Sequence, residues 1–540
     1  DRFDLEKKIV IASGTQALVR LMLNQAVRDR LQGINSAGLV TGYRGSPLGG
    51  VDATFTKAEK FLKKNNIKFQ YGLNEDLAAT AIWGSQQTEL RNEGKHDGVF
   101  GLWYGKGPGV DRCGDVFRHS NLAGTSKYGG VLVAMGDDHS AESSTELHQS
   151  EYALVDAMMP ILSPAGVQDI LDFGIKGWAL SRYSGLWVGV KCLKDTIEVT
   201  EVVDASFDRV NIVVPEDKYH EELNIRLGDT APVREDRLHN KKIRAAKIFA
   251  RANSLNKIQY SPAKKKLGII SAGKSWLDTV HALNLLGIDK EEAEKYALTT
   301  LKLGMVWPLD DGFIKKWAKG LEKILVVEEK RGLIEGQVKE ALYGMENSPH
   351  IIGKYDESGE LLLPSNGVLD PIIVGQAIAN KLIGSSKSES LEHSLNSFSA
   401  DARSEANTPA PDRIPYFCSG CPHNSSTKVP EGSIAYAGIG CHTMAIWMDR
   451  STDGPTHMGG EGINWVGQAP FSNRNHVFQN LGDGTYNHSG LLAIRAAIAA
   501  NTNITYKILF NDAVAMTGGQ SHEGDLSADE ILSLIHISEP

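Results

Sequence analysis

The chain has 540 residues, which at about 150 residues per domain indicates roughly three or four folded units. Hydrophobic residues make up 41% and charged residues 23%, which excludes a disordered chain. The formal charge of -9 includes no basic block, so we expect no nucleic-acid partner. No apolar run approaches the roughly 18 residues of a membrane span, and the start DRFDLEKK is charged. We therefore expect a cytoplasmic protein with no membrane partner.

The first part of the chain alternates helix and strand patterns. Residues 15–31 have helical periodicity. Four apolar runs, at 37–43, 97–104, 129–135 and 185–193, each have a Gly or Asp within the next two residues. This rhythm predicts an α/β domain over residues 1–225 with a mostly parallel sheet.

Two linkers are predicted to separate the remaining domains. Residues 226–262 are polar and lack a strand pattern, whereas 263–384 again alternate strands and helices as a smaller α/β domain. Residues 385–412 are rich in Ser, Asn, Ala and Pro, as flexible linkers are. A third domain is predicted over 413–540. Because the chain starts with Asp1 and its last residues, SLIHISEP, carry no terminating pattern, we expect a fragment truncated at its C-terminus.

A Gly-Asp-Gly turn, Gly482 to Gly484, lies between a strand pattern and a helix pattern. Asp483 and Asn511 would then end neighbouring strands, at the edge where open α/β sheets bind ligands. Carboxylate and amide oxygens suit Mg²⁺, which bridges diphosphate oxygens. Glycines in 516–520 would let backbone N–H groups approach the same phosphates. Alone, Gly-Asp-Gly is more often a simple turn, but the separation of 28 positions (511 minus 483) resembles the signature of thiamine diphosphate enzymes.

Three of the five cysteines lie within 24 residues, at Cys418, Cys421 and Cys441. Two thiolates separated by two intervening residues can chelate zinc or an iron-sulfur cluster, and the spacing does not distinguish between these. A fourth ligand would have to come from sequence beyond the chain or from Cys113, Cys192, His423 or His442.

The loop 41–50, TGYRGSPLGG, follows a predicted strand. Arg44 could make a planar two-point contact with a substrate carboxylate, and Ser46 could donate to a keto oxygen. The alternative is an ordinary turn between a strand and a helix. Three histidines in similar loops stay unassigned: His119, His139 and His148.

Long motifs resemble the 2-oxoacid:ferredoxin oxidoreductases, and among them the long, fused bacterial indolepyruvate type. GYRGSPLGG, NEDLAATAIWGSQQ and GKGPGVDR resemble its pyrimidine-binding part; LGIISAGKSW and ILVVEEKRGLIE its middle part; YFCSGCPHNSSTKVPEG, NLGDGTYNHSGLLAIRAA and NDAVAMTGGQ its diphosphate-binding part. The resemblance implies the thiamine diphosphate-binding fold: two doubly wound parallel-sheet domains, pyrimidine-type at 1–225 and diphosphate-type at 413–540, flanking a transketolase C-terminal-like α/β domain at 263–384.

The resemblance also implies roles for particular residues. Glu75, whose ordinary interpretation is an acid at a helix N-terminus, becomes the acid that activates thiamine diphosphate, and Arg44 and Ser46 become substrate contacts. Mg²⁺ is held by Asp483, Asn511 and the carbonyl of Ala513, and a 4Fe-4S cluster by the three clustered cysteines. Further contacts to the cofactor come from Gly482, Gly484, Thr517 and Gly518. The family's fourth cluster cysteine lies beyond the diphosphate motif, where this chain has none.

The implied reaction is oxidative decarboxylation of an aryl 2-oxo acid to the acyl-coenzyme A, with electrons passed to ferredoxin, in a homodimer. A non-redox thiamine diphosphate decarboxylase or transketolase-like enzyme is the alternative; it would contain no iron, and the Cys418–Cys421 pair argues against it. A zinc-binding scaffold protein would leave the spacing between Asp483 and Asn511 unexplained.

Overall fold

The computed structural model describes residues 2–142, 146–216, 223–383, 391, 416–521, 523–524 and 526–536. These fall into two compact units: the first holds the residues up to 391 except 71–74, and the second holds 71–74 and the residues from 416 onward. The predicted linker 385–412, Leu391 excepted, lies outside the described residues. In the described part of the chain, no helix is both long and apolar enough to cross a membrane.

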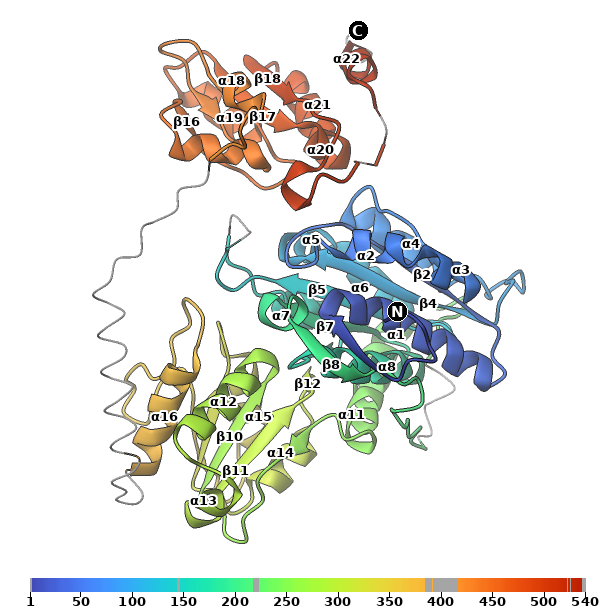
Figure 1. Ribbon diagram of the computed structural model, residues 1–540, viewed down its shortest axis with the longest axis vertical. Helices are drawn as coiled ribbons and strands as arrows, with labels where there is room; N and C mark the ends of the chain where they lie inside the picture. Colours follow the sequence, from blue (N-terminus) through green and yellow to red (C-terminus); the bar gives the residue numbers. More distant parts are fainter. Residues whose placement is uncertain are drawn as a thin grey trace. The chain divides into compact units, whose positions relative to one another are not determined.

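The first unit contains a seven-stranded sheet (Figure 1). Every neighbouring pair in it is parallel except β12–β6. In spatial order its strands are β12 (Met305–Trp307), β6 (Ile161–Leu162), β7 (Trp187–Leu193), β5 (Val131–Asp137), β4 (Gly98–Lys106), β2 (Ser36–Gly42) and β3 (Ile67–Phe69). Beside it, β1 (Ile9–Ser13) and β8 (Thr200–Asp204) form an antiparallel pair. The predicted α/β class with parallel strands is confirmed.

Helices cover both faces of this sheet, because alternate strand residues point to opposite sides. On β4, Leu102 and Tyr104 join one hydrophobic cluster, whereas Trp103 between them joins the other. The helices of this region are α1 (Gly14–Leu31), α2 (Val51–Lys57), α3 (Glu59–Lys64), α4 (Glu75–Ser85), α5 (Gly107–Arg112), α6 (Gly114–Ala123), α7 (Glu151–Asp156), α8 (Val167–Ser184) and α9 (Lys194–Ile197).

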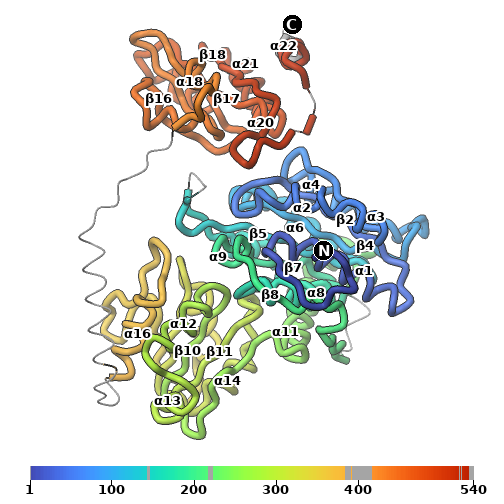
Figure 2. Tube along the Cα trace, viewed as in Figure 1, coloured from blue at the N-terminus to red at the C-terminus, as the bar shows by residue number. Residues whose placement is uncertain are grey.

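A five-stranded sheet forms the rest of the first unit, and its chain path can be followed in Figure 2. Its order is β14 (His350–Ile352), β13 (Lys323–Val327), β10 (Leu267–Ala272), β11 (Leu298–Leu303) and β9 (Lys257–Ile258), with only β9 antiparallel to its neighbour. The accompanying helices are α12 (Gly273–Leu285), α13 (Lys290–Lys295), α14 (Asp311–Ala318), α15 (Leu333–Leu342) and α16 (Pro371–Ile383).

Two features join the two sheets of the first unit more closely than the sequence suggested. Directly after β11, the chain adds β12 to the edge of the seven-stranded sheet. Residues 226–262, predicted as a linker, contain helices α10 (Ala231–Asp236), η2 (Arg237–Lys242) and α11 (Ile243–Ala252). Phe249 and Leu255 of this segment are buried in the same hydrophobic cluster as α1 and α8. The segment therefore belongs to the packed core.

The second unit has a four-stranded parallel sheet, in the order β16 (Thr452–Asp453), β15 (Ala435–Tyr436), β17 (Val477–Gly482) and β18 (Ile504–Leu509). Its helices are α18 (His423–Ser426), η3 (Cys441–Trp447), α19 (Ile463–Gln468), η4 (Ala469–Phe471), α20 (Asp483–Thr485), η5 (Tyr486–Gly490), α21 (Leu491–Ala499), η6 (Ala515–Thr517) and α22 (Ala528–His536).

All three parallel sheets are doubly wound. In each, the chain leaves two neighbouring strands in opposite directions: β2 and β4, β10 and β13, and β15 and β17. At such a switch point the loops after the two strands diverge and leave a crevice at the carboxyl edge, where open α/β sheets bind ligands.

Candidate functional site

Asp483 and Asn511 lie together at the carboxyl edge of the second unit's sheet. One carboxylate oxygen of Asp483, Oδ2, accepts the backbone N–H of Asn511 at 2.9 Å and that of Asp512 at 2.7 Å. The other, Oδ1, accepts the N–H of Gly484 at 2.9 Å. The side-chain oxygen of Asn511 accepts the N–H of Ala513 at 3.1 Å. The Asp483 carboxylate is therefore hydrogen-bonded to the backbone that carries Asn511, so that a carboxylate and an amide side chain lie at the same edge of the sheet.

The segment after this pair turns on two glycines. Gly518 and Gly519 have φ values of 124° and 72°, conformations that favour glycine. The hydroxyl of Thr517 lies 3.0 Å from the Oε1 of Gln520, and the backbone N–H of Val514 donates to the carbonyl of Gln520 at 2.8 Å. The motif predicted to approach a diphosphate is thus a closed turn beside Asn511.

Buried polar atoms without hydrogen-bond partners gather at the switch point between β15 and β17. The Nε2 of His442 and both amide atoms of Asn480 have no partner among the described residues. A Cβ added to Gly438 would lie 2.7 Å from that Nε2, so only glycine lets the backbone approach the ring this closely. Because unpaired buried polar atoms are costly, they indicate a site that a polar ligand completes.

Glu461 is a buried acid at the same place that the sequence interpretation missed. Its Oε1 accepts the N–H of Ile439 at 3.3 Å, its Oε2 accepts that of Gly459 at 2.6 Å, and burial raises its pKa. The only sequence signal for it is a lone acid among the glycines of MGGEG.

Two of the three clustered cysteines, Cys418 and Cys421, lie in one turn. Burial raises the pKa of Cys441, and the negative charges of Cys418 and Cys421 raise it further. The N–H of Cys421 donates to the carbonyl of Cys418 at 3.0 Å, closing a turn on Gly420 with a φ of 77°. In the described ranges, however, no group of three or more His, Cys, Asp or Glu side chains is arranged to hold a metal ion. The residue types fit a cluster, but the ligand geometry is not formed.

The proposed fourth ligands divide into two kinds. Cys113 and Cys192 are buried core residues of the first unit. Burial raises the pKa of Cys113 well above its usual value and that of Cys192 to about 12. Ligation through their thiolates is therefore disfavoured. His423 and His442 lie beside the clustered cysteines in sequence. Burial lowers the pKa of His423 and lowers that of His442 to about 4, so the imidazole of His442 is neutral at pH 7.

Glu75 begins α4 in the first unit, and its side chain is buried. Its backbone carbonyl accepts the indole N–H of Trp103 at 3.0 Å. A Cβ added to Gly109 would lie 2.7 Å from the Oε1 of Glu75. Helix α5, which directly follows β4, therefore packs against this carboxyl group.

Arg44 is placed differently from its predicted role. Its Nε lies 2.8 Å from the Oδ2 of Asp52, and the two side chains are only 1% and 2% exposed. The other oxygen of Asp52 accepts a short hydrogen bond from the hydroxyl of Tyr104. The charge of Arg44 is thus neutralised in a sealed pair, whereas Ser46 in the same loop is half-buried.

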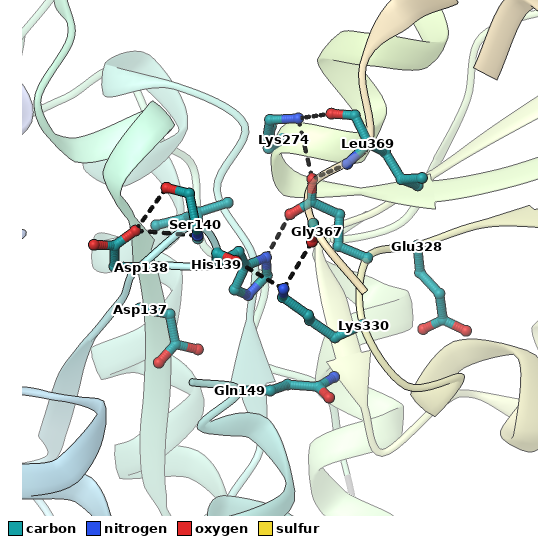
Figure 3. A network of polar contacts seen from close by, with 12 residues as sticks. Asp137, Asp138, His139, Ser140, Gln149, Lys274, Glu328, Lys330, Gly367 and Leu369 are labelled. Atoms are coloured by element: carbon teal, nitrogen blue, oxygen red, sulfur yellow. Dashed lines mark hydrogen bonds and ion pairs between the residues drawn. The ribbon is translucent and has the colours of Figure 1, made fainter. Parts of the chain in front are cut away.

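The switch point of the five-stranded sheet is occupied by a loop from the seven-stranded sheet (Figure 3). His139 makes a short contact with Glu329, and its backbone carbonyl accepts the ammonium of Lys330 at 2.7 Å. Lys274 lies 3.1 Å from Glu329. Charged residues also line a cavity of about 40 Å³ there, which has room for a few water molecules. Of the unassigned histidines, His139 is thus a buried domain contact, whereas the Nε2 of His148 lies 2.8 Å from Asp111 and His119 is exposed.

The fold belongs to the class of doubly wound α/β architectures, in which ligands bind at the carboxyl edges of the strands. Residues 257–405 match the family model described as the indolepyruvate oxidoreductase domain. The chain is 25% identical to the indolepyruvate oxidoreductase subunit IorA of Methanothermobacter marburgensis over 95% of this chain and 76% of that one. The corresponding subunit of Pyrococcus horikoshii is 24% identical over 94% and 76%. The predicted resemblance is confirmed: the chain is an oxidoreductase related to the indolepyruvate oxidoreductases.

Two solved structures are also similar. A 2-oxoglutarate:ferredoxin oxidoreductase from Magnetococcus marinus has a TM-score of 0.48 and 13% identity, covering 70% of this chain and 66% of that one, just under two thirds. A split-gene transketolase has a TM-score of 0.39 and 16% identity, covering 67% of this chain and 96% of that one.

Proposed function

We propose that the chain carries the catalytic site for oxidative decarboxylation of an aryl 2-oxo acid, with thiamine diphosphate and Mg²⁺ as cofactors. Coenzyme A would accept the acyl group, and ferredoxin the electrons. The pairing of Asp483 with the Asn511 segment carries the proposal, because it puts hard oxygen ligands at a sheet edge that also holds unpaired buried polar atoms. The names of the relatives support the substrate class. We infer a cytoplasmic homodimer.

Asp483, Asn511 and the carbonyl of Ala513 would hold Mg²⁺, which neutralises the diphosphate. Gly482 and Gly484 flank this position, and Thr517 and Gly518 in the adjacent turn would contact the phosphates. When bound, thiamine diphosphate supplies a nucleophilic carbon and an electron sink for the loss of CO₂. The neutral His442 imidazole and the Asn480 amide would form hydrogen bonds to the bound cofactor.

Glu75 would exchange a proton with the aminopyrimidine ring of the cofactor. A buried carboxyl group suits this role, because it can hold a hydrogen bond to a ring nitrogen without competition from water. Its support comes from the burial of its side chain and from the close packing of Gly109. Ser46, half-buried in the loop after β2, would donate to the keto oxygen of the substrate.

Cys418, Cys421 and Cys441 would hold a 4Fe-4S cluster with a fourth ligand still to be identified. Their residue type and the turn that contains Cys418 and Cys421 support this, since cysteine thiolates are the usual ligands of such clusters.

To test this proposal, a chain completed at its C-terminus is purified anaerobically and analysed for iron, sulfide and zinc. The same sample is assayed for reduction of a viologen dye that depends on indolepyruvate and coenzyme A. We expect iron with sulfide, and dye reduction. The variant Glu75→Gln should keep cofactor binding and lose dye reduction by about 100-fold or more. Unchanged activity in this variant would remove Glu75 from its role.

A non-redox thiamine diphosphate enzyme is the second candidate, favoured by the absence of a formed three-ligand metal site among the described residues. It predicts bound thiamine diphosphate with zinc or no metal, and release of the aldehyde without dye reduction. That result would replace the oxidoreductase proposal.

A further inference from the structure

The crevice between β2 and β4 is the switch point of the seven-stranded sheet. From β2 the chain continues to β3 on one side, and from β4 to β5 on the other. The loop with Arg44 and Ser46 follows β2, and Lys106 ends β4. Ligands of open α/β sheets bind at such positions, so this crevice is where a substrate would meet the first unit.

An anionic substrate needs a cation here, and Arg44 is poorly placed to provide it. Its guanidinium is 2.8 Å from Asp52 inside a pair that is almost fully buried, and Tyr104 holds the second oxygen of Asp52. Opening this pair would leave the Asp52 carboxylate buried without its counter-charge, which is strongly unfavourable.

Lys106 is the last residue of β4, at the same switch point, and is more exposed than Arg44. Its aliphatic stem packs under the loop, since a Cβ added to Gly45 would lie 2.6 Å from its Cδ. Burial lowers the pKa of Lys106, while the charges of Glu75 and Asp138 act in the opposite direction. Asp138 is also bound locally, with its Oδ1 2.9 Å from the hydroxyl of Ser140.

The geometry points to Lys106, rather than Arg44, as the residue that binds the carboxylate of the substrate. The inference rests on the proposed function and sharpens it, because it replaces the cation expected from the sequence. Lys106 would hold the carboxylate close to Glu75, so that the keto carbon and the acid share one crevice. Arg44 instead stabilises the loop that covers the stem of Lys106.

The test compares two substrates that differ only in the carboxylate. The two substrates are an aryl 2-oxo acid and the corresponding arylacetaldehyde. Both are oxidised to the same acyl-coenzyme A with two electrons passed to the dye, but only the acid has a carboxylate and releases CO₂. For Lys106→Met, kcat/KM for the acid should fall on the order of 10- to 100-fold, with the aldehyde affected less than about twofold. Lys106→Arg should restore part of the loss, and Lys68→Met on β3 serves as the control.

Binding of a non-reacting arylpropionate, measured by calorimetry on the cofactor-loaded protein, gives an independent readout. Lys106→Met should weaken it by a similar factor, and Arg44→Lys should not. Equal loss with both substrates, or an acid-selective loss in Arg44→Lys alone, would overturn the inference. If the unmodified protein oxidised neither substrate, the proposed function would fail, while the arylpropionate titration would still decide the role of Lys106.

Discussion

The carboxylate of Asp483 accepts the backbone N–H groups of both Asn511 and Asp512, so that the ends of β17 and β18 are joined through one side chain. These residues are 28 positions apart in sequence, and the parallel pairing of the two strands brings them together. The same carboxylate therefore shapes the edge of the sheet and offers negative charge for a cation.

The first prediction separates these two roles of Asp483. In Asp483→Asn the amide oxygen can still accept backbone N–H groups, but the charge is lost, so the fold should persist while Mg²⁺-dependent binding of thiamine diphosphate weakens on the order of 10- to 100-fold. Cofactor titration followed by fluorescence measures this. Asp449→Asn, an exposed acid of the same unit, is the matched control. Unchanged affinity would exclude Asp483 as a ligand.

The second prediction concerns the space beside Glu75. A methyl group at Gly109 would approach the Cγ of Glu75 to 2.6 Å and its Oε1 to 2.7 Å, so Gly109→Ala must displace the carboxyl group. We expect dye reduction to fall roughly 10-fold or more, because small misplacements of catalytic groups are costly. Gly114→Ala, where an added Cβ meets nothing within 4 Å, should keep full activity. Equal activity of the two variants would contradict this placement of Glu75.

The third prediction concerns the contact between His139 and Glu329. Burial alone would raise the pKa of Glu329, but His139 and Lys274 outweigh it and lower this pKa to about 2. Since the folded pKa is below the unfolded value of about 4.3, the stabilisation is complete above that value and is lost as the pH falls toward 2.

Glu329→Gln should therefore lower the free energy of unfolding at pH 7 by about 3 kcal/mol and flatten its decline below pH 4. Urea denaturation at several pH values measures both effects. The exposed Glu340→Gln serves as the control. A variant as stable as the unmodified protein at pH 7 would show that the contact contributes nothing.

The fourth prediction concerns Lys242, which is fully buried in η2. Its Nζ donates to the carbonyls of Gly185 at 3.0 Å and Asn121 at 3.3 Å, and burial lowers its pKa to about 7. The unfolded chain, with a pKa of about 10.4, binds more protons between these values, so stability should rise with pH from about 7 to 10.

Lys242→Met should remove this pH dependence and leave the protein more stable near pH 6 than the unmodified chain. Thermal unfolding between pH 6 and 9.5 measures it, with the half-buried neighbour Lys241→Met as the control. A pH profile that keeps its slope in Lys242→Met would refute the assignment to Lys242.

The sequence by itself determined the α/β class and the placement of Asp483 and Asn511 after neighbouring parallel strands. Alternating strand and helix patterns predict parallel strands, and the ends of neighbouring parallel strands meet at one edge, so spacing along the chain was enough to bring these two residues together. The proximity of Cys418 and Cys421 was also local, because a turn of four residues contains both.

Only the tertiary structure decided which charges are neutralised and which elements are shared between sheets. The sequence predicts Arg44 as a substrate contact, but in the structure its guanidinium pairs with Asp52, whose other oxygen is held by Tyr104. The sequence leaves His139 unassigned, whereas in the structure it contacts Glu329, 190 positions away. Phe249, in the predicted linker 226–262, is buried in the core of the first unit. Strand β12 pairs with β6 at the edge of the seven-stranded sheet. Such pairings follow from contacts between distant segments, which neither local periodicity nor motif spacing encodes.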